Sequence, residues 1–373
     1  MHNYNKIYAR IPMKYLKPIF KKILNPLKRL KVYLKHQAGW LDVPKIIPYR
    51  GFGSETDVFI EGMVIEDKGL TKPKDQHKFW QNILATIKRF SSDEIAGVQV
   101  RANFLGDTQT CETDELGYFS FHFDITNKLQ QVDYSQWFSV DFELMDEVVE
   151  NQKKILAKGE VRIISPTQKR MIISDIDDTV LVSHSTQIMR KLRLMLFKNA
   201  LTRKPFKGVT EFYKALNKGN NDSSDFPFFY VSSSEWNLYD LLDDFFFINE
   251  LPKGIFLLRK LEYSIYKFWK SGGGSHQHKY EKIKRLLGLF PDQKVILIGD
   301  SGQKDPWIYS DIALEFPGRI EAIYIRKIRS KSLLNQEQNI LKKLRNIETE
   351  YLELESTIGA IEHARANGFI PSD

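Results

Sequence analysis

The first forty residues alternate apolar and basic positions with a helical period. Between residues 15 and 36, apolar side chains recur at steps of three and four, and lysine or arginine fills the gaps. Pro18 and Pro26 interrupt the segment, so a kinked or broken helix is expected. A basic amphipathic helix suits a membrane surface, but its apolar face also suits packing on the protein's own core.

Residues 49–166 have the texture of a β domain. Short runs rich in β-branched and aromatic side chains are separated by turn sequences, and residues 138–144 alternate apolar and polar positions. This pattern predicts a small β-sandwich, with a helix inserted at residues 78–90 and no catalytic cluster of its own. The predicted strands are Val58–Ile65, Val98–Ala102, Gly117–Phe123, Phe138–Leu144 and Val161–Ile163.

From Met171 onward, continuous apolar runs alternate with helical segments such as Tyr280–Leu287. Strands of this kind are buried on both faces, as in a parallel sheet between two layers of helices. We therefore predict an α/β domain with a doubly wound parallel sheet, in which ligands bind beyond the carboxyl ends of the strands. The predicted strands are Met171–Ser174, Phe228–Val231, Gly254–Leu258, Val295–Ile298 and Ala322–Ile325, followed by a charged helix over residues 331–356.

These patterns divide the chain into four segments. A basic amphipathic arm covers residues 1–47, and an all-β sandwich domain covers residues 48–166. The α/β domain follows at residues 167–330, with a helical extension at residues 331–373. A length of 373 residues agrees with two domains of ordinary size.

The charge is unevenly distributed. Residues 1–41 contain ten of the 55 lysines and arginines and none of the 47 acidic residues, so the remainder of the chain is close to neutral. Such an arm fits an anionic surface, either nucleic acid or membrane. No apolar run approaches the roughly 18–20 residues that span a bilayer, and no secretory signal is evident, so a cytoplasmic protein is expected. The single cysteine, Cys111, excludes an intramolecular disulfide framework and a cysteine-rich zinc module.

Polar side chains follow three of the predicted parallel strands, and a lysine stands at a helix start. Asp175 and Asp177 follow the first strand and project to one side, because positions i and i+2 of an extended segment share a face. Two carboxylates so close call for a cation or a proton between them, and Mg²⁺ suits hard oxygen ligands. The other polar residues are Ser232, Lys279, Asp300 and Asp305.

Each of these features is common by itself in turns, helix caps and solvated surfaces. Their joint order along one α/β pattern is more specific. Several acids, one lysine and one serine suit a phosphoryl group, whose charge the metal and the lysine balance while the hydroxyl binds an equatorial oxygen. A carboxylate can also act as the nucleophile and form an aspartyl phosphate.

The order of these residues resembles the haloacid dehalogenase superfamily of phosphohydrolases. The fuller strings around them are Ser174-Asp175-Ile176-Asp177-Asp178-Thr179, Tyr230-Val231-Ser232-Ser233-Ser234, His278-Lys279 and Ile298-Gly299-Asp300-Ser301-Gly302-Gln303-Lys304-Asp305-Pro306. These strings are similar to the actin-patch-type phosphatidate phosphatase family and its bacterial relatives. The resemblance extends over roughly residues 48–370 and is strongest over residues 171–310.

The resemblance implies a role for each residue. Asp175 would attack phosphorus, and Asp177 would protonate the leaving oxygen and then activate water. Mg²⁺ would bind Asp175, the main-chain carbonyl of Asp177 and Asp300. Ser232 would bind a phosphoryl oxygen, while Asp305 would hold a metal-bound water or orient Lys279.

Three functions are consistent with these observations. The favoured one is a Mg²⁺-dependent phosphatidate phosphatase that releases diacylglycerol and contacts an anionic membrane through residues 1–36, rather than nucleic acid. Aromatic and basic residues at 263–270 and 190–198 fit a membrane-facing rim or ordinary helix packing. The second function is a phosphomonoesterase acting on nucleic-acid ends, phosphoproteins or soluble metabolites. The third is a non-catalytic lipid-binding adaptor.

Overall fold

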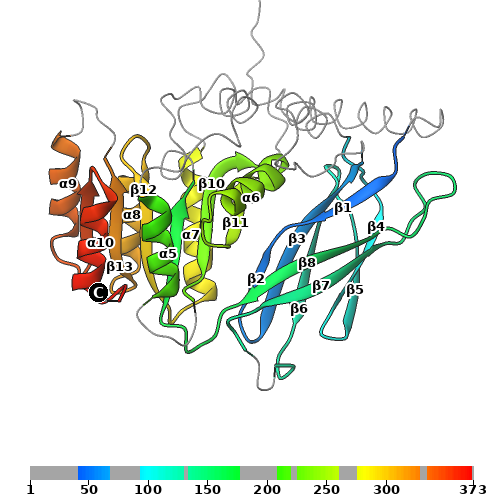
Figure 1. Ribbon diagram of the computed structural model, residues 1–373, viewed down its shortest axis with the longest axis horizontal. Helices are drawn as coiled ribbons and strands as arrows, with labels where there is room; N and C mark the ends of the chain where they lie inside the picture. Colours follow the sequence, from blue (N-terminus) through cyan, green and yellow to red (C-terminus); the bar gives the residue numbers. More distant parts are fainter. Residues whose placement is uncertain are drawn as a thin grey trace, which may run out of the picture.

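The computed structural model describes residues 41–67, 93–129, 133–176, 208–219, 225–259, 275–327 and 334–371. These residues form an N-terminal β domain and a C-terminal α/β domain that lie side by side (Figure 1). The predicted fold class is thereby confirmed. Asp177, nearly all of the basic arm, the predicted helix at 78–90 and the two aromatic-basic segments lie outside the described residues.

The β domain is a single, mostly antiparallel sheet of eight strands around an apolar core. Its long strand β3 pairs along one edge with β6, and along the other with β2 and β1 in turn. Successive side chains of a strand point to opposite faces of the sheet. Val58 and Ile60 of β3 are therefore buried in this core, whereas Phe59 and Glu61 point away from it. The strands are β1 (Pro44–Pro48), β2 (Gly51–Gly53), β3 (Asp57–Glu66), β4 (Gln99–Phe104), β5 (Asp107–Glu112), β6 (Tyr118–Asp124), β7 (Trp137–Leu144) and β8 (Leu156–Ile163).

The α/β domain is built on six parallel strands in the order β11-β10-β9-β12-β13-β14. The chain reverses its direction of winding between β9 and β12, which creates a topological switch point there. The strands are β9 (Arg170–Asp175), β10 (Phe228–Glu235), β11 (Ile255–Arg259), β12 (Lys294–Asp300), β13 (Ile320–Arg326) and β14 (Glu350–Leu354).

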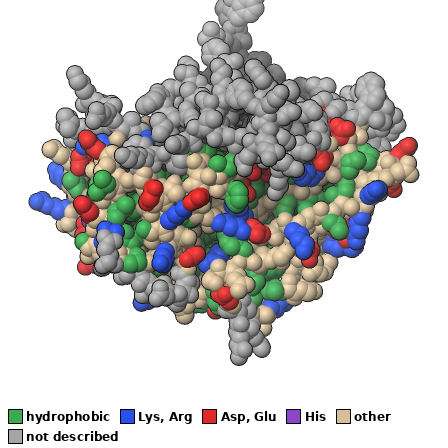
Figure 2. All heavy atoms as spheres, viewed as in Figure 1, with side chains coloured by type: hydrophobic (Ala, Val, Ile, Leu, Met, Phe, Trp, Pro, Cys, Tyr) green, Lys and Arg blue, Asp and Glu red, His purple; other side chains and the backbone are tan. Residues whose placement is uncertain are grey.

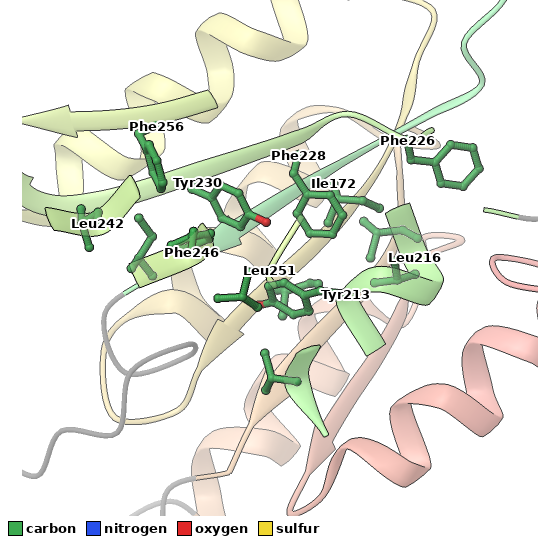
Figure 3. Close-up of a cluster of buried hydrophobic side chains, with 14 of the residues drawn as sticks. Ile172, Tyr213, Leu216, Phe226, Phe228, Tyr230, Leu242, Phe246, Leu251 and Phe256 are labelled. Atoms are coloured by element: carbon green, nitrogen blue, oxygen red, sulfur yellow. The ribbon is translucent and has the colours of Figure 1, made fainter. Parts of the chain in front are cut away.

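Helices cover both faces of this sheet, and each face has its own apolar cluster. On one face α5, α6 and α10 pack on the cluster that contains Ile172, Tyr230 and Phe256 (Figure 3). On the other face α7, α8 and α9 pack on the cluster that contains Ile173 and Phe229. The helices are α5 (Val209–Lys218), α6 (Tyr239–Ile248, after the 3-10 turn η1, Trp236–Leu238), α7 (Ser275–Leu289), α8 (Asp305–Glu315), α9 (Leu334–Leu344) and α10 (Thr357–Ala366).

The prediction of one charged helix over residues 331–356 is wrong. Strand β14 lies between α9 and α10 and pairs in parallel with β13. Tyr351 packs on the cluster under α9, whereas Leu352 and Leu354 pack on the opposite cluster, so the side chains alternate with the period of a strand. The surrounding glutamates concealed this short alternation in the sequence.

The two domains share part of one core. Tyr49 of the β domain stacks on Trp236 with ring centroids 4.0 Å apart, and its ring belongs to the cluster under α6. Arg50 binds Asp243 of α6 at 2.6 Å, and its backbone N–H donates to the Tyr239 hydroxyl at 3.0 Å. The domain boundaries drawn from the sequence stay predictions. The contact between the two domains combines apolar packing with an ion pair and a hydrogen bond.

Surface charge is mixed on the face shown in Figure 2. Basic and acidic side chains of the described residues are interspersed there, without a large patch of one sign. Within the described ranges, no helix combines the length and apolar character that crossing a bilayer requires.

Candidate active site

Three buried carboxylates meet at the carboxyl end of the parallel sheet. Asp175 ends β9 and Asp300 ends β12, the two strands that flank the switch point. Asp305 begins α8, the helix that follows β12. All three residues are fully buried, with 0% of their surface exposed. One carboxylate oxygen from each lies within 4.8 Å of the others.

The backbone around Asp300 forms a tight turn that fixes its carboxylate. Oδ1 of Asp300 accepts the N–H groups of Gly302 at 2.7 Å and Gln303 at 3.1 Å. The N–H of Asp300 in turn donates to Oδ2 of Asp305 at 3.3 Å. Asp300 is therefore both a turn residue and a site residue, because the turn orients its carboxylate toward the other acids.

Lys279 supplies the positive charge of this cluster. It lies in the first turns of α7, is 4% exposed, and places Nζ 2.9 Å from Oδ1 of Asp175. The same ammonium binds Oδ1 of Asp305. Burial alone would lower the pKa of Lys279, but the carboxylates of Asp175 and Asp305 outweigh it and raise the pKa above its usual value. Lys279 is therefore a permanent cation at neutral pH.

Ser232 lies in β10, the strand next to β9, just beyond the stretch of β10 that pairs with β9. The pairing of Val231 with Asp175 places Ser232 one residue beyond the level of the nucleophile candidate. Its hydroxyl Oγ accepts the N–H of Ser234 at 2.8 Å, and its carbonyl accepts Nζ of Lys282 at 3.3 Å. Ser232 is thus buried and oriented at the same edge of the sheet as the three aspartates.

The structure brings together five of the six residues selected from the sequence at one edge of the sheet. Asp175, Lys279, Asp300 and Asp305 contact one another directly or share a cluster, and Ser232 lies in the adjacent strand, one residue past its last pair with β9. The sixth, Asp177, lies outside the described residues.

Sequence reasoning assigned no role to three supporting residues. The hydroxyl of Tyr309 donates to the carbonyl of Ile298 at 3.1 Å, beneath the acids. Burial, and then the neighbouring carboxylates with Asp305 first, raise the pKa of Tyr309, so its phenol stays protonated. Tyr213 bonds Ser174 Oγ at 2.7 Å and thereby supports the end of β9.

The third such residue is Gly299, the next-to-last residue of β12, which belongs to the quoted motif but had been given no role of its own. A methyl group on its Cα would lie 2.6 Å from Oδ2 of Asp305 and 2.7 Å from Cε2 of Tyr309. Only glycine allows α8 to bring Asp305 this close to the strand. A glycine inside a strand is the available sequence signal, because it often marks such a close approach.

The donor set fits a divalent cation. Three carboxylates and one ammonium leave a net charge of −2 when all are ionised, and buried charge of this kind requires compensation. Among the residues that the structure describes, the metal-binding side chains that converge are all carboxylates, which favours a hard cation over a soft metal. The geometry thus defines a candidate metal-dependent phosphoryl-transfer site at the switch point of a doubly wound sheet.

Comparison with known proteins agrees with this class. Residues 170–327 match the family described as phosphatidate phosphatase APP1, catalytic domain. The resemblance seen in the sequence is thereby confirmed: this segment is similar to the APP1 catalytic domain family.

Two curated relatives extend the match. The chain is 34% identical over 178 residues to phosphatidate phosphatase APP1 of Saccharomyces cerevisiae, which covers 47% of this chain and 29% of that protein. It is 26% identical over 284 residues to an uncharacterized protein of Schizosaccharomyces pombe, with coverage of 73% and 44%. The chain therefore spans less than half the length of either relative.

A solved structure also aligns with the chain, at low similarity. It is a carbohydrate acetylesterase from Xanthomonas citri, 9% identical, with a TM-score of 0.26 over 82% of this chain and 66% of that one. A likeness this weak supports no conclusion about fold or function.

Proposed function

We propose that this protein is a Mg²⁺-dependent phosphatidate phosphatase that works through an aspartyl-phosphate intermediate. The observation that supports this most strongly is the convergence of Asp175, Asp300, Asp305 and Lys279 inside a segment that matches the APP1 catalytic domain. The three acids favour the binding of a cation, and the lysine favours an anionic substrate. The family match favours a lipid phosphate as that substrate.

Asp175, Asp300 and Asp305 are the described residues that would hold the metal. When bound, the ion offsets the negative charge of the acids and of the phosphoryl group, so that an anionic carboxylate can approach an anionic ester. The family resemblance adds the main-chain carbonyl of Asp177 as a further ligand.

The chemistry begins with Asp175. Its carboxylate oxygen forms a bond to phosphorus while the bond from phosphorus to the diacylglycerol oxygen breaks, and Asp177 gives that oxygen a proton. Water then forms the new bond to phosphorus, gives a proton back to Asp177, and releases Asp175 and inorganic phosphate.

Lys279 and Ser232 position the phosphoryl group in this scheme. The ammonium of Lys279 stays protonated and stabilises the charge that builds on the equatorial oxygens. The Ser232 hydroxyl, oriented by the Ser234 N–H, donates its proton to another of these oxygens. Asp305 holds Lys279 in place from the opposite side.

The membrane part of the proposal rests on the sequence of the arm. Residues 1–36 combine basic and apolar positions in a way that suits the cytoplasmic surface of an anionic membrane, where phosphatidate resides. Flotation with anionic liposomes, with and without residues 1–41, tests this part independently of catalysis.

The test of the activity is phosphate release from phosphatidate in mixed micelles, with and without Mg²⁺. Asp175→Asn should lower kcat by at least about 10³-fold, because the amide is not a nucleophile. Asp292→Asn is the matched control, since Asp292 is exposed beside the amino end of β12, and it should keep full activity. Full activity of Asp175→Asn would contradict the mechanism.

A panel of substrates separates the remaining alternatives. Faster turnover of soluble phosphomonoesters or of nucleic-acid ends than of phosphatidate would favour the second function. Metal binding without turnover of any phosphomonoester would favour the lipid-binding adaptor.

A further inference from the structure

A cavity of about 600 Å³ lies where the two domains meet. One wall is the edge strand β11 with the helix α7, and the other wall is the outward face of β3 and β6. Figure 1 shows β11 on the side of the parallel sheet that faces the β domain. The volume falls within the range of about 300–1,000 Å³ that is usual for small-molecule sites.

The lining of this cavity is basic. Four lysines and arginines line it, with Glu61 as the one acidic residue among the described lining residues. Arg50 is neutralised by Asp243 at 2.6 Å and Glu160 at 3.7 Å. The other basic lining residues are Arg259 and Lys282, which have interactions of their own, and Arg285.

Arg285 contributes the most accessible positive charge. Its side chain is exposed on α7, and its guanidinium carbon lies 5.6 Å from the centroid of the Phe59 ring. Among the residues that the structure describes, no carboxylate lies within ion-pair distance of Arg285. Its charge is therefore available to an anion that enters the cavity.

The same cavity has an apolar wall. Phe52, Phe59, Trp236 and Leu286 line it together with the basic groups. Phe59 and Arg285 adjoin each other, so the apolar and basic parts of the lining are continuous. A ligand that matches both parts carries an acidic head on an apolar body.

We propose that this cavity binds an anionic amphiphile as a second ligand, separate from the phosphoryl group of the substrate. The neutral diacylglycerol part of phosphatidate would leave the charge of Arg285 unmatched, whereas an acidic head matches it. The site adjoins the catalytic edge, because Lys282 lines the cavity and donates to the carbonyls of Ser232 at 3.3 Å and Leu257 at 2.8 Å.

Binding is measured by calorimetry on the full chain with three probes: decanoate, decanol and inorganic phosphate. None of them is a phosphomonoester, so turnover plays no part and the result stands whatever becomes of the proposed function. Decanoate should bind more tightly than either control, because only decanoate offers both the acidic head and the apolar body. Decanol binding as tightly would reduce the site to an apolar pocket and overturn the proposal.

Two charge variants locate the binding. Arg285→Glu should weaken decanoate binding about tenfold, the usual effect of losing one charge-assisted contact. Glu61→Gln should strengthen decanoate binding, because it removes a negative charge from the lining. Misfolding cannot produce this effect, since misfolding would weaken binding. Lys284→Glu is the matched control, because Lys284 is exposed on the same helix, pairs with Glu315 and does not line the cavity.

Two further results would overturn the proposal. One is equal decanoate affinity in Arg285→Glu, Lys284→Glu and the unchanged protein, which would place binding elsewhere. The other is loss of decanoate binding when the protein is saturated with inorganic phosphate, or binding of inorganic phosphate as tight as that of decanoate. Either outcome would assign the ligand to the aspartate centre or to a site for simple anions.

Discussion

The two domains bury polar groups in different ways. In the β domain, buried Thr113 donates to the carbonyl of Ile95 at 3.0 Å and accepts the N–H of Val98 at 3.1 Å, so it joins two backbone segments. Buried Glu66 accepts the N–H of Asp42 at 3.1 Å in a similar way. In the α/β domain, by contrast, buried Asp175, Lys279 and Asp305 bind one another at one edge of the sheet.

This difference separates structural from functional burial. A buried polar group that hydrogen-bonds to nearby backbone groups stabilises the fold, because these hydrogen bonds offset the cost of burying it. Several buried charges that converge carry a large desolvation cost that a smaller apolar cluster would avoid. The second arrangement therefore indicates chemistry, and it identifies the site without reference to any relative.

The largest effect is expected for Lys279→Met. The variant leaves Asp175 and Asp305 without their shared ammonium, so activity should fall by about 10³-fold. Unfolding free energy without metal should fall by about 3–5 kcal/mol, because a buried ion pair loses one partner. Urea unfolding and phosphate release measure both, and Mg²⁺ should restore part of the stability. Equal loss in exposed Lys284→Met would contradict the assignment.

The stability gap between the unchanged protein and Lys279→Met should depend on pH. The pKa of Lys279 is raised in the folded state, so its contribution is complete below the ordinary lysine pKa of about 10.4 and declines as pH rises further. Urea unfolding of both proteins at several pH values measures the gap. It should be constant from neutral pH to about 9 and should narrow at more alkaline pH. Narrowing on acidification through neutral pH would show that another group sets it.

Gly299→Ala should lower kcat by about 10²-fold while leaving most of the fold intact. The added methyl group displaces Asp305 or Tyr309, and a shift of about 1 Å in a catalytic group has effects of this size. Gly288→Ala on α7 is the control, because nothing lies within 4 Å of the added carbon. That control should gain about 0.5–1 kcal/mol of helix stability and keep its activity. Steady-state kinetics and thermal unfolding distinguish the two.

The smallest effect on catalysis is expected in the β domain. Thr113→Val removes two backbone hydrogen bonds and should cost about 1–2 kcal/mol of unfolding free energy. Phosphate release at saturating substrate should be unchanged, since Thr113 belongs to the other domain. A matching loss of kcat in the folded variant would show that polar burial in the β domain also serves the active site.

The parallel strands were readable from the sequence because they are buried on both faces. Residues 171–173 and 295–298 form unbroken apolar runs, and the acids that end these strands stand out against them. The convergence of Asp175 and Asp300 then followed from the rule that ligands bind at a switch point.

Other elements left no comparable signal. Strand β5 has no buried residue, so it lacks an apolar face, and β1 is bounded by Pro44 and Pro48. Strand β14 has an alternation too short to outweigh its charged neighbours. Tyr309 belongs to the site only through tertiary packing, which no local spacing encodes.

The stacking of Tyr49 on Trp236 has a consequence for how the molecule unfolds. Trp236 follows Ser234 by two residues and is packed in a cluster built from both domains. Detaching the β domain would uncover that cluster and loosen the adjoining serine segment of β10, Ser232–Ser234. We expect a single cooperative transition for both domains, so that a destabilising substitution in the β domain would lower the unfolding temperature of the α/β domain with it.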